Sequence, residues 1–582
     1  MFNMALAAGR GVGMVFLRIG AVSGAGAVCL GAYGAHNRRF TGRSGCISLV
    51  GEENSRSVRT PRVGEAKMSK TATEKRYDLS VFYNTVKEEH RSPMKTKIRG
   101  EIPKWIDGSL YRNGGGMWEI GKDSYNHLFD AMTLLHRYRI KDGDVTYQSQ
   151  FLRSDHYKKN MKYNRIVCTE FGTIAHKDPC LTLFERIAAY FKPPGGSDNC
   201  GVNMMYIGDE LFALTETQYM RRVDPTTLDT TDNDKIDITN YVAVNSASAH
   251  PHFLNDGTHF NMGSSFGKKC NYNILKLEPG ESKGEQKWSM LCSIPARGRD
   301  PSYFHSFGLT DNYIIYLEQP LVINVLKVLT SKFRGLPTTG CMEYRPKNKA
   351  YFHLINRHTG ERLATEYNAS AFFCFHHINA YEDDGHVVVD LCCYNNDEIL
   401  QRTNVAELKK GVPPADESEA RRFVFPLNVD KASKDTNLVT LPYTSCTATV
   451  TADGSVFCTP EVMLDEAFEA PRINYEKHNG KPYQYVYGVT GNNQGLIKID
   501  MKSKTFKVWE EKGYMPSEPV FIGSPSATGE DDGVVLSAVL TSDRAKPNFL
   551  VVLNGKDFTE LGRAEIEAQI PYGIHGLFVP NI

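Results

Sequence analysis

The sequence lacks an excess of charge of either sign. Its 582 residues include 68 lysines and arginines against 67 aspartates and glutamates, a formal net charge of +1 at pH 7. A basic surface is the usual footprint of a protein that binds nucleic acid, and a balanced chain has no such overall field. We therefore expect no nucleic-acid partner. Apolar residues make up 41% of the chain, which is enough for a large core.

Paired cysteine motifs are also missing. The 13 cysteines are an odd number, they are scattered, and no two of them form a C-x-x-C motif. Cys392 and Cys393 are adjacent within an apolar run, where neighbouring side chains of a strand point to opposite faces. This pattern argues against a disulfide framework and a structural zinc site, and it favours a reducing compartment.

Acidic residues are absent from the start of the chain until Glu52. Residues 1–50 contain arginine but no lysine and are rich in Ala, Gly and Ser, which is typical of a mitochondrial transit peptide. A secretory signal, a membrane anchor and an extension without a targeting role are the alternatives. The uncharged stretch from Ile19 to Asn37 is dominated by Gly and Ala, so it is weakly hydrophobic for a spanning helix. Residues 51–77 are polar and predict a disordered join, followed by one domain over residues 78–582.

Long amphipathic helices are scarce in that domain, and the candidates are Leu181 to Phe191 and Leu321 to Phe333. Elsewhere the chain consists of short β-prone runs such as GHVVVDLCCY and GVVLSAVLTSD, many preceded by Asp-Gly or a similar turn signal. Four-stranded units repeated around an axis would accommodate a domain of this length and protect its sheet edges. No repeat of fixed period is visible, so a propeller is preferred to a sandwich or barrel but is not required by the pattern.

Four of the 17 histidines lie in strand-like runs of apolar or small residues that are soon followed by a turn signal. His127 and His136, by contrast, flank apolar residues in a way that indicates structural roles. Inward-facing residues of successive blades would converge on one axis, and four neutral imidazoles suit a borderline metal such as Fe²⁺. Taken singly, each is more simply explained as a structural residue. The four candidates are His250, His305, His376 and His575.

Three glutamates lie in apolar or proline-bounded settings that suit a supporting role. A metal-bound histidine usually donates its second ring N–H to an acceptor, which fixes its tautomer. Glu216 in LTETQY, Glu469 in AFEAPRINY and Glu518 in YMPSEPVF are the candidates for this task.

At these residues the sequence resembles the carotenoid cleavage oxygenase family, over about residues 78 to 582. The resemblance depends on many segments in a fixed order, and this makes it specific. These segments are NGSLYRNGGG, GKDSYNHLFDAM, RIVCTEFGT, AHPHFLNDGT, FHSFGLT, FHHINAYEDDG, VVVDLCCY, FVFPLNV, GKPYQYVYG, YMPSEP and the terminal IHGLF.

The resemblance implies a seven-bladed β-propeller with a helical or loop cap over an axial iron site. By motif match, His250, His305, His376 and His575 would bind one Fe²⁺, while Glu216, Glu469 and Glu518 would bond those histidines. The last strand would then close the propeller and deliver the fourth ligand. O₂ would be the co-substrate, and no side-chain base is required.

Within the family the ending PYGIHG, the segment EQPLVINVLKVLTSKFRG and the run LGRAE resemble the branch that cleaves carotenoids eccentrically. That branch is associated with mitochondria, in agreement with the leader. The implied reaction is cleavage of the 9′,10′ double bond, which yields apo-10′-carotenals and ionone-type products. Central 15,15′ cleavage and retinyl-ester isomerohydrolysis on the same scaffold are the alternatives, followed by a carotenoid-binding propeller without turnover.

Two positions depart from the family pattern. Its Gly-Pro-Gly is Gly114-Gly115-Gly116 here, and its Phe-Asp-Gly ends in Ala131. Alanine would be strained if position 131 needed a positive φ. We expect altered loop rigidity near the entrance or cap, with the iron ligands unaffected.

The two candidate helices, Leu181 to Phe191 and Leu321 to Phe333, have apolar residues at helical spacing. They predict contact with a membrane, where a carotenoid substrate is dissolved. Helices that face the core are the competing interpretation. We expect both segments to lie in the interface around a tunnel mouth, and Cys180 lies where lipid modification has been discussed for relatives. The expected interface residues are Phe184, Ile187, Phe191, Val325, Leu326 and Leu329.

Overall fold

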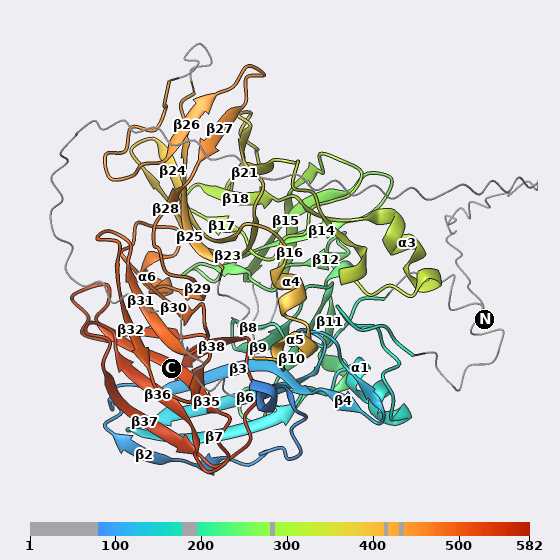
Figure 1. Cartoon of the computed structure of the whole chain (residues 1–582), viewed down its shortest axis with the longest axis vertical. Helices are drawn as coiled ribbons and strands as arrows, with labels where there is room; N and C mark the ends of the chain where they lie inside the picture. The colour runs from blue at the N-terminus through green and yellow to red at the C-terminus, as the bar shows by residue number, and fades with distance from the viewer. Residues whose placement is uncertain (1–78, 177–194, 280–285, 412–416, 430–435, 582) are drawn as a thin grey trace, which may run out of the picture. The chain divides into compact units, whose positions relative to one another are not determined.

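β-Strands arranged around a central axis make up most of the regular secondary structure of the computed structural model (Figure 1), which describes residues 79–176, 195–279, 286–411, 417–429 and 436–581. Within these ranges, seven sheets of four to six strands form the blades, and two small two-stranded ribbons accompany them. The expected seven-bladed β-propeller is therefore confirmed.

The first three blades come from the N-terminal half of the chain and from its last strand. Blade 1 contains β1 (Met94–Lys95), β3 (Gly108–Met117), β6 (Met132–Lys141), β7 (Asp144–Phe151) and β38 (His575–Pro580); blade 2 contains β8 (Asn203–Ile207), β9 (Glu210–Leu214), β10 (Tyr219–Val223) and β11 (Lys235–Asp237); blade 3 contains β12 (Ser246–Ala247), β13 (His252–Phe253), β14 (His259–Ser265), β15 (Asn271–Pro279) and β16 (Gln286–Pro295).

The other four blades follow around the axis. Blade 4 contains β17 (Gly308–Leu309), β18 (Tyr313–Glu318), β21 (Ala350–Asn356), β22 (Tyr367–Ala369), β26 (Thr447–Val450) and β27 (Val456–Thr459); blade 5 contains β23 (Phe373–Asp383), β24 (His386–Tyr394), β25 (Glu419–Pro426) and β28 (Glu461–Val462); blade 6 contains β29 (Phe468–Arg472), β30 (Tyr485–Thr490), β31 (Gly495–Asp500) and β32 (Thr505–Glu510); blade 7 contains β2 (Lys97–Gly100), β33 (Tyr514–Pro516), β34 (Val520–Gly523), β35 (Gly533–Thr541), β36 (Asn548–Asn554) and β37 (Glu560–Ile566). The ribbons are β4 (Glu119–Ile120) with β5 (Asp123–Ser124), and β19 (Leu321–Ile323) with β20 (Met342–Tyr344).

Each blade is buried on both faces, which explains why many of its strands are nearly continuous apolar runs. Along β18, Ile314 and Tyr316 pack against blade 3, whereas Ile315 and Leu317 pack against blade 5. This alternation follows from the two-residue period of a strand. Seven buried apolar clusters lie between neighbouring blades in this way, one at each interface.

The Asp-Gly signals mark tight hairpins, as the sequence predicted. Asp384 and Gly385 connect β23 to β24 with φ values of 39° and 74°, between the paired residues Asp383 and His386. Two consecutive residues with positive φ form the turn whose twist matches that of antiparallel strands, and Asp-Gly tolerates this conformation well.

Both ends of the domain close the ring. β38 pairs with β3 in blade 1, while β2 pairs with β37 in blade 7. Because β1 pairs with β7 in blade 1, the short segment from β1 to β2 passes from the first blade to the last. This closure is held by backbone hydrogen bonds on both sides.

Short helices lie mainly in the long connections between strands, and α4 contributes to the cap over the axis. Ile399 and Leu400 of α4 pack with Tyr303 and Phe375 in one buried aromatic cluster. The helices are η1 (Leu79–Tyr83), α1 (Asp155–Tyr163), η2 (Asp232–Asp234), η3 (Ile238–Asn240), α3 (Val325–Arg334), η4 (Thr339–Cys341), α4 (Ile399–Arg402), α5 (Val405–Leu408) and α6 (Tyr475–His478).

The two predicted long helices have different outcomes. The helix expected from Leu181 to Phe191 lies outside the described residues, as do Cys180 and the predicted interface residues Phe184, Ile187 and Phe191. The helix expected from Leu321 begins later, at Val325, because residues 321–323 form β19 and Asn324 caps the helix by accepting a bond from the backbone N–H of Lys327.

The two departures from the family pattern lie in β3 of blade 1 and in the connection that leads into β6 of the same blade. Gly115 is inside β3 and Ala131 directly precedes β6, and both are buried. Ala131 does not have a positive φ. A Cβ atom added at Gly115 would lie 2.7 Å from the Cβ of Ala131 and 2.8 Å from the Trp118 ring. The two positions therefore share one packing space, while the expected change in loop rigidity stays a prediction.

Candidate metal centre

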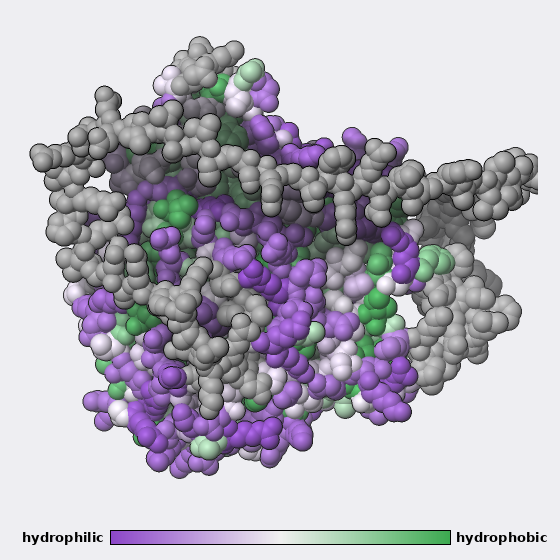
Figure 2. Space-filling view, in the orientation of Figure 1, coloured by the Kyte–Doolittle hydropathy of each residue, from purple (hydrophilic) through white to green (hydrophobic). Residues whose placement is uncertain are grey.

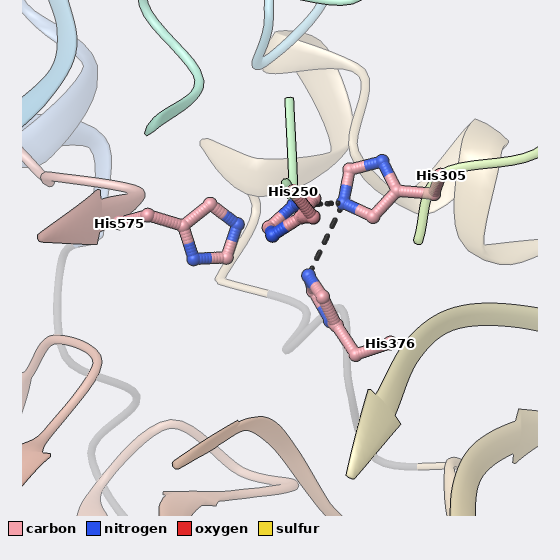
Figure 3. Close-up of side chains that lie close together, drawn as sticks. All are labelled: His250, His305, His376 and His575. Atoms are coloured by element: carbon pink, nitrogen blue, oxygen red, sulfur yellow. Dashed lines mark hydrogen bonds between the residues drawn. The ribbon is translucent and has the colours of Figure 1, made fainter. Parts of the chain in front are cut away.

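The structure brings together the four histidines that the sequence singled out (Figure 3). His250 lies between β12 and β13 of blade 3, and His305 precedes β17 of blade 4. His376 belongs to β23 of blade 5, and His575 is the first residue of β38 in blade 1. Each of these four blades contributes its segment nearest the axis, so residues far apart in the sequence meet at one point.

Nitrogen atoms of the four imidazoles converge closely. One ring nitrogen from each histidine lies within 4.8 Å of all the others. The Nε2 atoms of His250 and His305 are 2.9 Å apart, and those of His305 and His376 are 3.1 Å apart. Protein metal–imidazole bonds are about 2 Å long, so nitrogens that bind one ion at right angles are about 3 Å apart.

Three of the imidazoles donate a hydrogen bond from their outer N–H group to a carboxylate. The Nδ1 atom of His305 lies 2.5 Å from Glu216 Oε1. The corresponding distances are 2.6 Å from His376 to Glu469 Oε2 and 2.8 Å from His575 to Glu518 Oε1. All three glutamates were predicted for this task from the sequence.

These bonds determine the tautomer. A carboxylate accepts, so each Nδ1 carries the proton and the Nε2 of a neutral ring presents a lone pair. Three inward-facing lone pairs, together with His250, form a donor set for a cation. The residues present therefore fit a borderline divalent metal such as Fe²⁺.

The carboxylates are held by further groups that the sequence analysis missed. Tyr303 Oη donates to Glu216 at 2.9 Å, and Tyr394 Oη donates to Glu469 at 3.0 Å. Arg472 instead forms a two-pronged ion pair with Glu518, at 2.8 Å and 3.0 Å. Tyr303 could have been found from its position two residues before His305, because residues at this spacing point to the same side of an extended chain.

The environment of His250, His305 and His575 favours their neutral form. Burial, aided by the neighbouring imidazoles, lowers the pKa of His250 well below its ordinary value. Burial also lowers the pKa of His305, against the opposing effect of Glu216. Burial lowers the pKa of His575 to about 4, although Glu518 favours its charged form. Neutral imidazole is the form that binds a metal.

Two of the supporting carboxylates, Glu469 and Glu518, stay ionised by contrast. Burial opposes the ionisation of Glu518, but Arg472 and His575 outweigh it and lower its pKa. The pKa of Glu469 is likewise lowered, because His376 outweighs the effect of burial. Ionised carboxylates are the acceptors that hold the Nδ1 protons in place.

The cluster is closed on one side and open on another. His305 and His575 are buried, whereas His250 and His376 are partly exposed. Phe375 packs against His305 with ring centroids 5.1 Å apart, and it belongs to the same buried cluster as α4. An apolar wall therefore adjoins a cluster in which two of the four histidines are partly exposed.

His127 and His136 have the structural surroundings that the sequence indicated. The His127 ring contacts the carbonyl of Leu400 at 3.2 Å and the hydroxyl of Thr403 at 3.0 Å. The Nδ1 atom of His136 lies 2.9 Å from the hydroxyl of Tyr147. Neither belongs to the four-histidine cluster.

Comparison with known proteins agrees with the sequence motifs. Residues 83–580 match the profile of a family described as retinal pigment epithelial membrane protein. The carotenoid-cleaving dioxygenase, mitochondrial, of Macaca fascicularis is 44% identical over 528 residues, covering 86% of this chain and 94% of that protein. The beta,beta-carotene 15,15′-dioxygenase of Rattus norvegicus is 39% identical over 525 residues, with coverages of 86% and 92%.

Solved structures share the fold. A mutant of Synechocystis apocarotenoid oxygenase aligns with a TM-score of 0.70 at 23% identity, covering 87% of this chain and 100% of that one. A cobalt-substituted Synechocystis enzyme of the same name aligns with a TM-score of 0.69 at 23% identity and the same coverages. The match to the profile, together with these relatives, shows that the chain belongs to the retinal pigment epithelial membrane protein family, the carotenoid oxygenases that its motifs resemble.

Proposed function

We propose that this chain is a non-haem iron dioxygenase that cleaves carotenoids, such as β-carotene and xanthophylls, at the 9′,10′ double bond. The observation that carries the proposal is the convergence of four imidazole nitrogens within 4.8 Å, three of them oriented by carboxylates. Several similar proteins named carotenoid-cleaving dioxygenase, at 43–44% identity, support the substrate class.

The chain's own residues have defined tasks in this reaction. His250, His305, His376 and His575 would hold Fe²⁺ through ring nitrogens, while Glu216, Glu469 and Glu518 keep the outer protons in place. When bound, the metal supplies the redox chemistry that O₂ requires. Both oxygen atoms are added across one double bond of the polyene, which breaks into two carbonyl fragments.

The apolar side of the site has a second task. Phe375, Phe373 and Tyr303 are buried beside the cluster, where they exclude water and present aromatic surface to a polyene. The position of the cleaved bond then depends on how far the substrate advances along such a wall. Central 15,15′ cleavage, the activity in the name of the rat relative, and retinyl-ester isomerohydrolysis are the competing reactions because they use the same scaffold.

Product identification tests the proposal. The purified, iron-loaded protein is incubated under oxygen with β-carotene or zeaxanthin, and the products are identified by mass. We expect an apo-10′-carotenal and its ionone partner. Retinal alone would assign central cleavage instead, and conversion of retinyl esters without carotenoid turnover would assign the isomerohydrolase reaction.

The ligand assignment has its own test. His305→Ala removes the imidazole closest to two of its partners, so we expect the loss of bound iron and of activity together. Activity retained without His305 would contradict the assignment of these four residues as ligands.

A membrane surface is the proposed source of substrate. Leu326 and Leu329 of α3 are 54% and 69% exposed, and Phe333 is 64% exposed, whereas Val325 is only partly so. The spacing of the three exposed residues puts them on one helical face, and Lys332 and Arg334 follow in the last turn. On the face drawn in Figure 2, most described surface is hydrophilic and hydrophobic residues form small separate groups, so an apolar helix face is unusual.

This contact is monotopic in the proposal. No helix among the described residues is both long enough and apolar enough to cross a bilayer. An amphipathic helix with an apolar face and basic residues can instead lie in the interface.

We also propose a mitochondrial location. Residues 1–50 have the composition of a transit peptide, and the relatives at 43–44% identity carry the word mitochondrial in their names. A fusion of residues 1–50 to a fluorescent protein should be imported into mitochondria. Secretion of the fusion, or its retention in the cytosol, would contradict this proposal.

A further inference from the structure

The histidines of the cluster come from different sheets, so no single strand ladder sets their spacing. His250 belongs to blade 3, the segment of His305 leads into blade 4, and His376 belongs to blade 5. Nitrogen separations of 2.9 Å and 3.1 Å join these three residues. Three small buried polar side chains bridge their backbones, and each contact falls within two residues of a histidine of the cluster.

Gln319 bridges the segments of His305 and His376. Its amide N–H groups donate to the carbonyls of Tyr303 at 3.1 Å and Cys374 at 3.2 Å. Its amide oxygen accepts the N–H of Cys374 at 2.8 Å. Tyr303 and Cys374 each precede their histidine by two residues, and Gln319 is only 3% exposed.

Ser306 joins the same two segments on the other side of the histidines. Its hydroxyl donates to the carbonyl of Phe375 at 2.7 Å and accepts the N–H of His377 at 2.9 Å. Ser306 directly follows His305, while Phe375 and His377 flank His376. Two independent bridges therefore connect this pair of imidazoles through their backbones.

Ser248 bridges the segments of His250 and His305. Its hydroxyl donates to the carbonyl of His305 and accepts the N–H of His250 at 3.0 Å. Ser248 is 3% exposed. The bridged segments are thus those of His250 with His305 and of His305 with His376. These are the two pairs whose Nε2 atoms lie 2.9 Å and 3.1 Å apart.

We infer that Ser248, Ser306 and Gln319 are positioning residues that set the spacing of the metal-binding nitrogens across blades 3, 4 and 5. They contact the backbone on either side of the histidines and act on the metal through them. The inference rests on the proposed iron function, and it adds a layer outside the three glutamates. Those glutamates orient the rings of His305, His376 and His575. Ser248, Ser306 and Gln319 instead fix the backbone segments that carry His250, His305 and His376.

A merely structural role is the competing interpretation, because any buried polar side chain must find partners. The two roles differ in their consequences. A structural residue affects the stability of the fold, while a positioning residue also changes the affinity and the coordination geometry of the metal. Measuring the metal separately from activity distinguishes them.

Cobalt binding provides the test. Gln319→Met keeps the length of the side chain but removes the three hydrogen bonds that the side-chain amide of Gln319 makes. Asn368→Leu is the matched control, since Asn368 is a fully buried amide of blade 4 that donates to Ser455 and not to a histidine segment. The wild type and both variants are first freed of metal with a chelator and are then titrated with Co²⁺. The visible absorption of the bound ion and the melting temperature of each protein are recorded.

We expect Gln319→Met to bind Co²⁺ roughly 10–100-fold more weakly, with altered absorption bands. Asn368→Leu should keep the affinity and the spectrum of the wild type even if its melting temperature falls. Ser306→Ala should behave like Gln319→Met, and Ser306→Thr, which keeps the hydroxyl, should restore the spectrum. These second variants keep the test decisive if one protein fails to fold.

Three results would overturn the inference. The first is a folded Gln319→Met and a folded Ser306→Ala with wild-type affinity and spectrum. The second is an equal change in Asn368→Leu, which would assign a structural role. The third is a wild type whose Co²⁺ binding is absent or survives His305→Ala. That result removes the proposed metal centre itself, and with it any role in positioning a metal.

Discussion

The three glutamates of the centre differ in the group that stabilises their carboxylate. Glu216 and Glu469 accept bonds from buried tyrosines, whereas Glu518 is paired with Arg472. Arg472 also donates to the carbonyl of Gly576 at 2.6 Å, directly after His575. The histidine at the end of the chain is therefore held by an ion-pair network, in keeping with its position on the strand that closes the ring.

Protonation of His575 gives a prediction at this scale. Its pKa is lowered from 6.5 to about 4, so between these values the unfolded chain binds a proton that the folded metal-free protein does not. Stability must then fall as the pH decreases through this window. From pH 7 to pH 5 the contribution of His575 is about 2 kcal/mol.

Urea unfolding of the metal-free protein, prepared with a chelator, measures this effect. The free energy of unfolding of His575→Gln should fall less between pH 7 and pH 5 than that of the wild type, because glutamine does not titrate. Equal pH dependence in the two proteins would show that His575 titrates normally in the folded state.

The packing of Gly115 against Ala131 gives a second prediction. Gly115→Ala places a methyl group against Ala131 and Trp118, and overpacking of this kind typically costs about 1–3 kcal/mol. Ala131→Gly opens part of that space. The double variant should therefore lose less stability than the sum of the single variants, as measured by denaturant unfolding.

The alternative outcome is simple additivity. It would mean that the two positions do not share space and that the clash with Trp118 dominates. A conservative change at a buried but distant site, such as Val551→Ala in β36, provides an additive control, because it lies in the core between blades 6 and 7.

Sequence reasoning found the residues whose own surroundings are distinctive. His250, His305, His376 and His575 lie in apolar strand-like runs, and family motifs identified them together with the three glutamates. Tyr394, Arg472 and Gln319 were missed because their significance depends on a partner in another blade. No local spacing encodes such a contact.

Among the elements, α3 shows how local chemistry corrects a periodicity. The apolar spacing from Leu321 predicted one helix, but Asn324 caps a helix that begins at Val325, and residues 321–323 pair with β20. Hairpins were predicted more reliably, because Asp-Gly turns have a defined geometry. The blade order was not readable from the sequence, since it depends on the packing of faces and no repeat of fixed period is visible.

The exposed face of α3 gives a prediction at the scale of elements. Leu329→Glu with Phe333→Glu should lower binding to anionic liposomes by at least about tenfold, since burying one large apolar side chain contributes about 1.5–3 kcal/mol. Sedimentation with liposomes measures the bound fraction, and circular dichroism checks the fold.

A matched control lies on β32. Phe506 and Val508 are also exposed apolar residues, at 46% and 41%, but they belong to the outer strand of blade 6. Phe506→Glu with Val508→Glu should leave liposome binding unchanged. Equal losses in the two pairs would indicate nonspecific adhesion, and no loss at α3 would remove its role as the membrane contact.

At the scale of the whole molecule, β38 unites stability with the metal centre. Phe578 packs into the core between blades 7 and 1, while Leu577 and Val579 pack into the core between blades 1 and 2. The same strand pairs with β3 over its full length and begins with His575. The last strand of the described chain therefore seals two interfaces and also supplies one nitrogen of the four-histidine cluster.

Truncation after Ile574 separates these two contributions when it is compared with His575→Gln. The truncated protein loses the β3 ladder and the apolar contacts at both interfaces, so we expect a large decrease in melting temperature and rapid hydrogen exchange along β3. His575→Gln retains β38 and should lose metal affinity while β3 stays protected. A truncated protein that keeps the protection of β3 would mean that the ring closes without its last strand, and that β38 serves the metal alone.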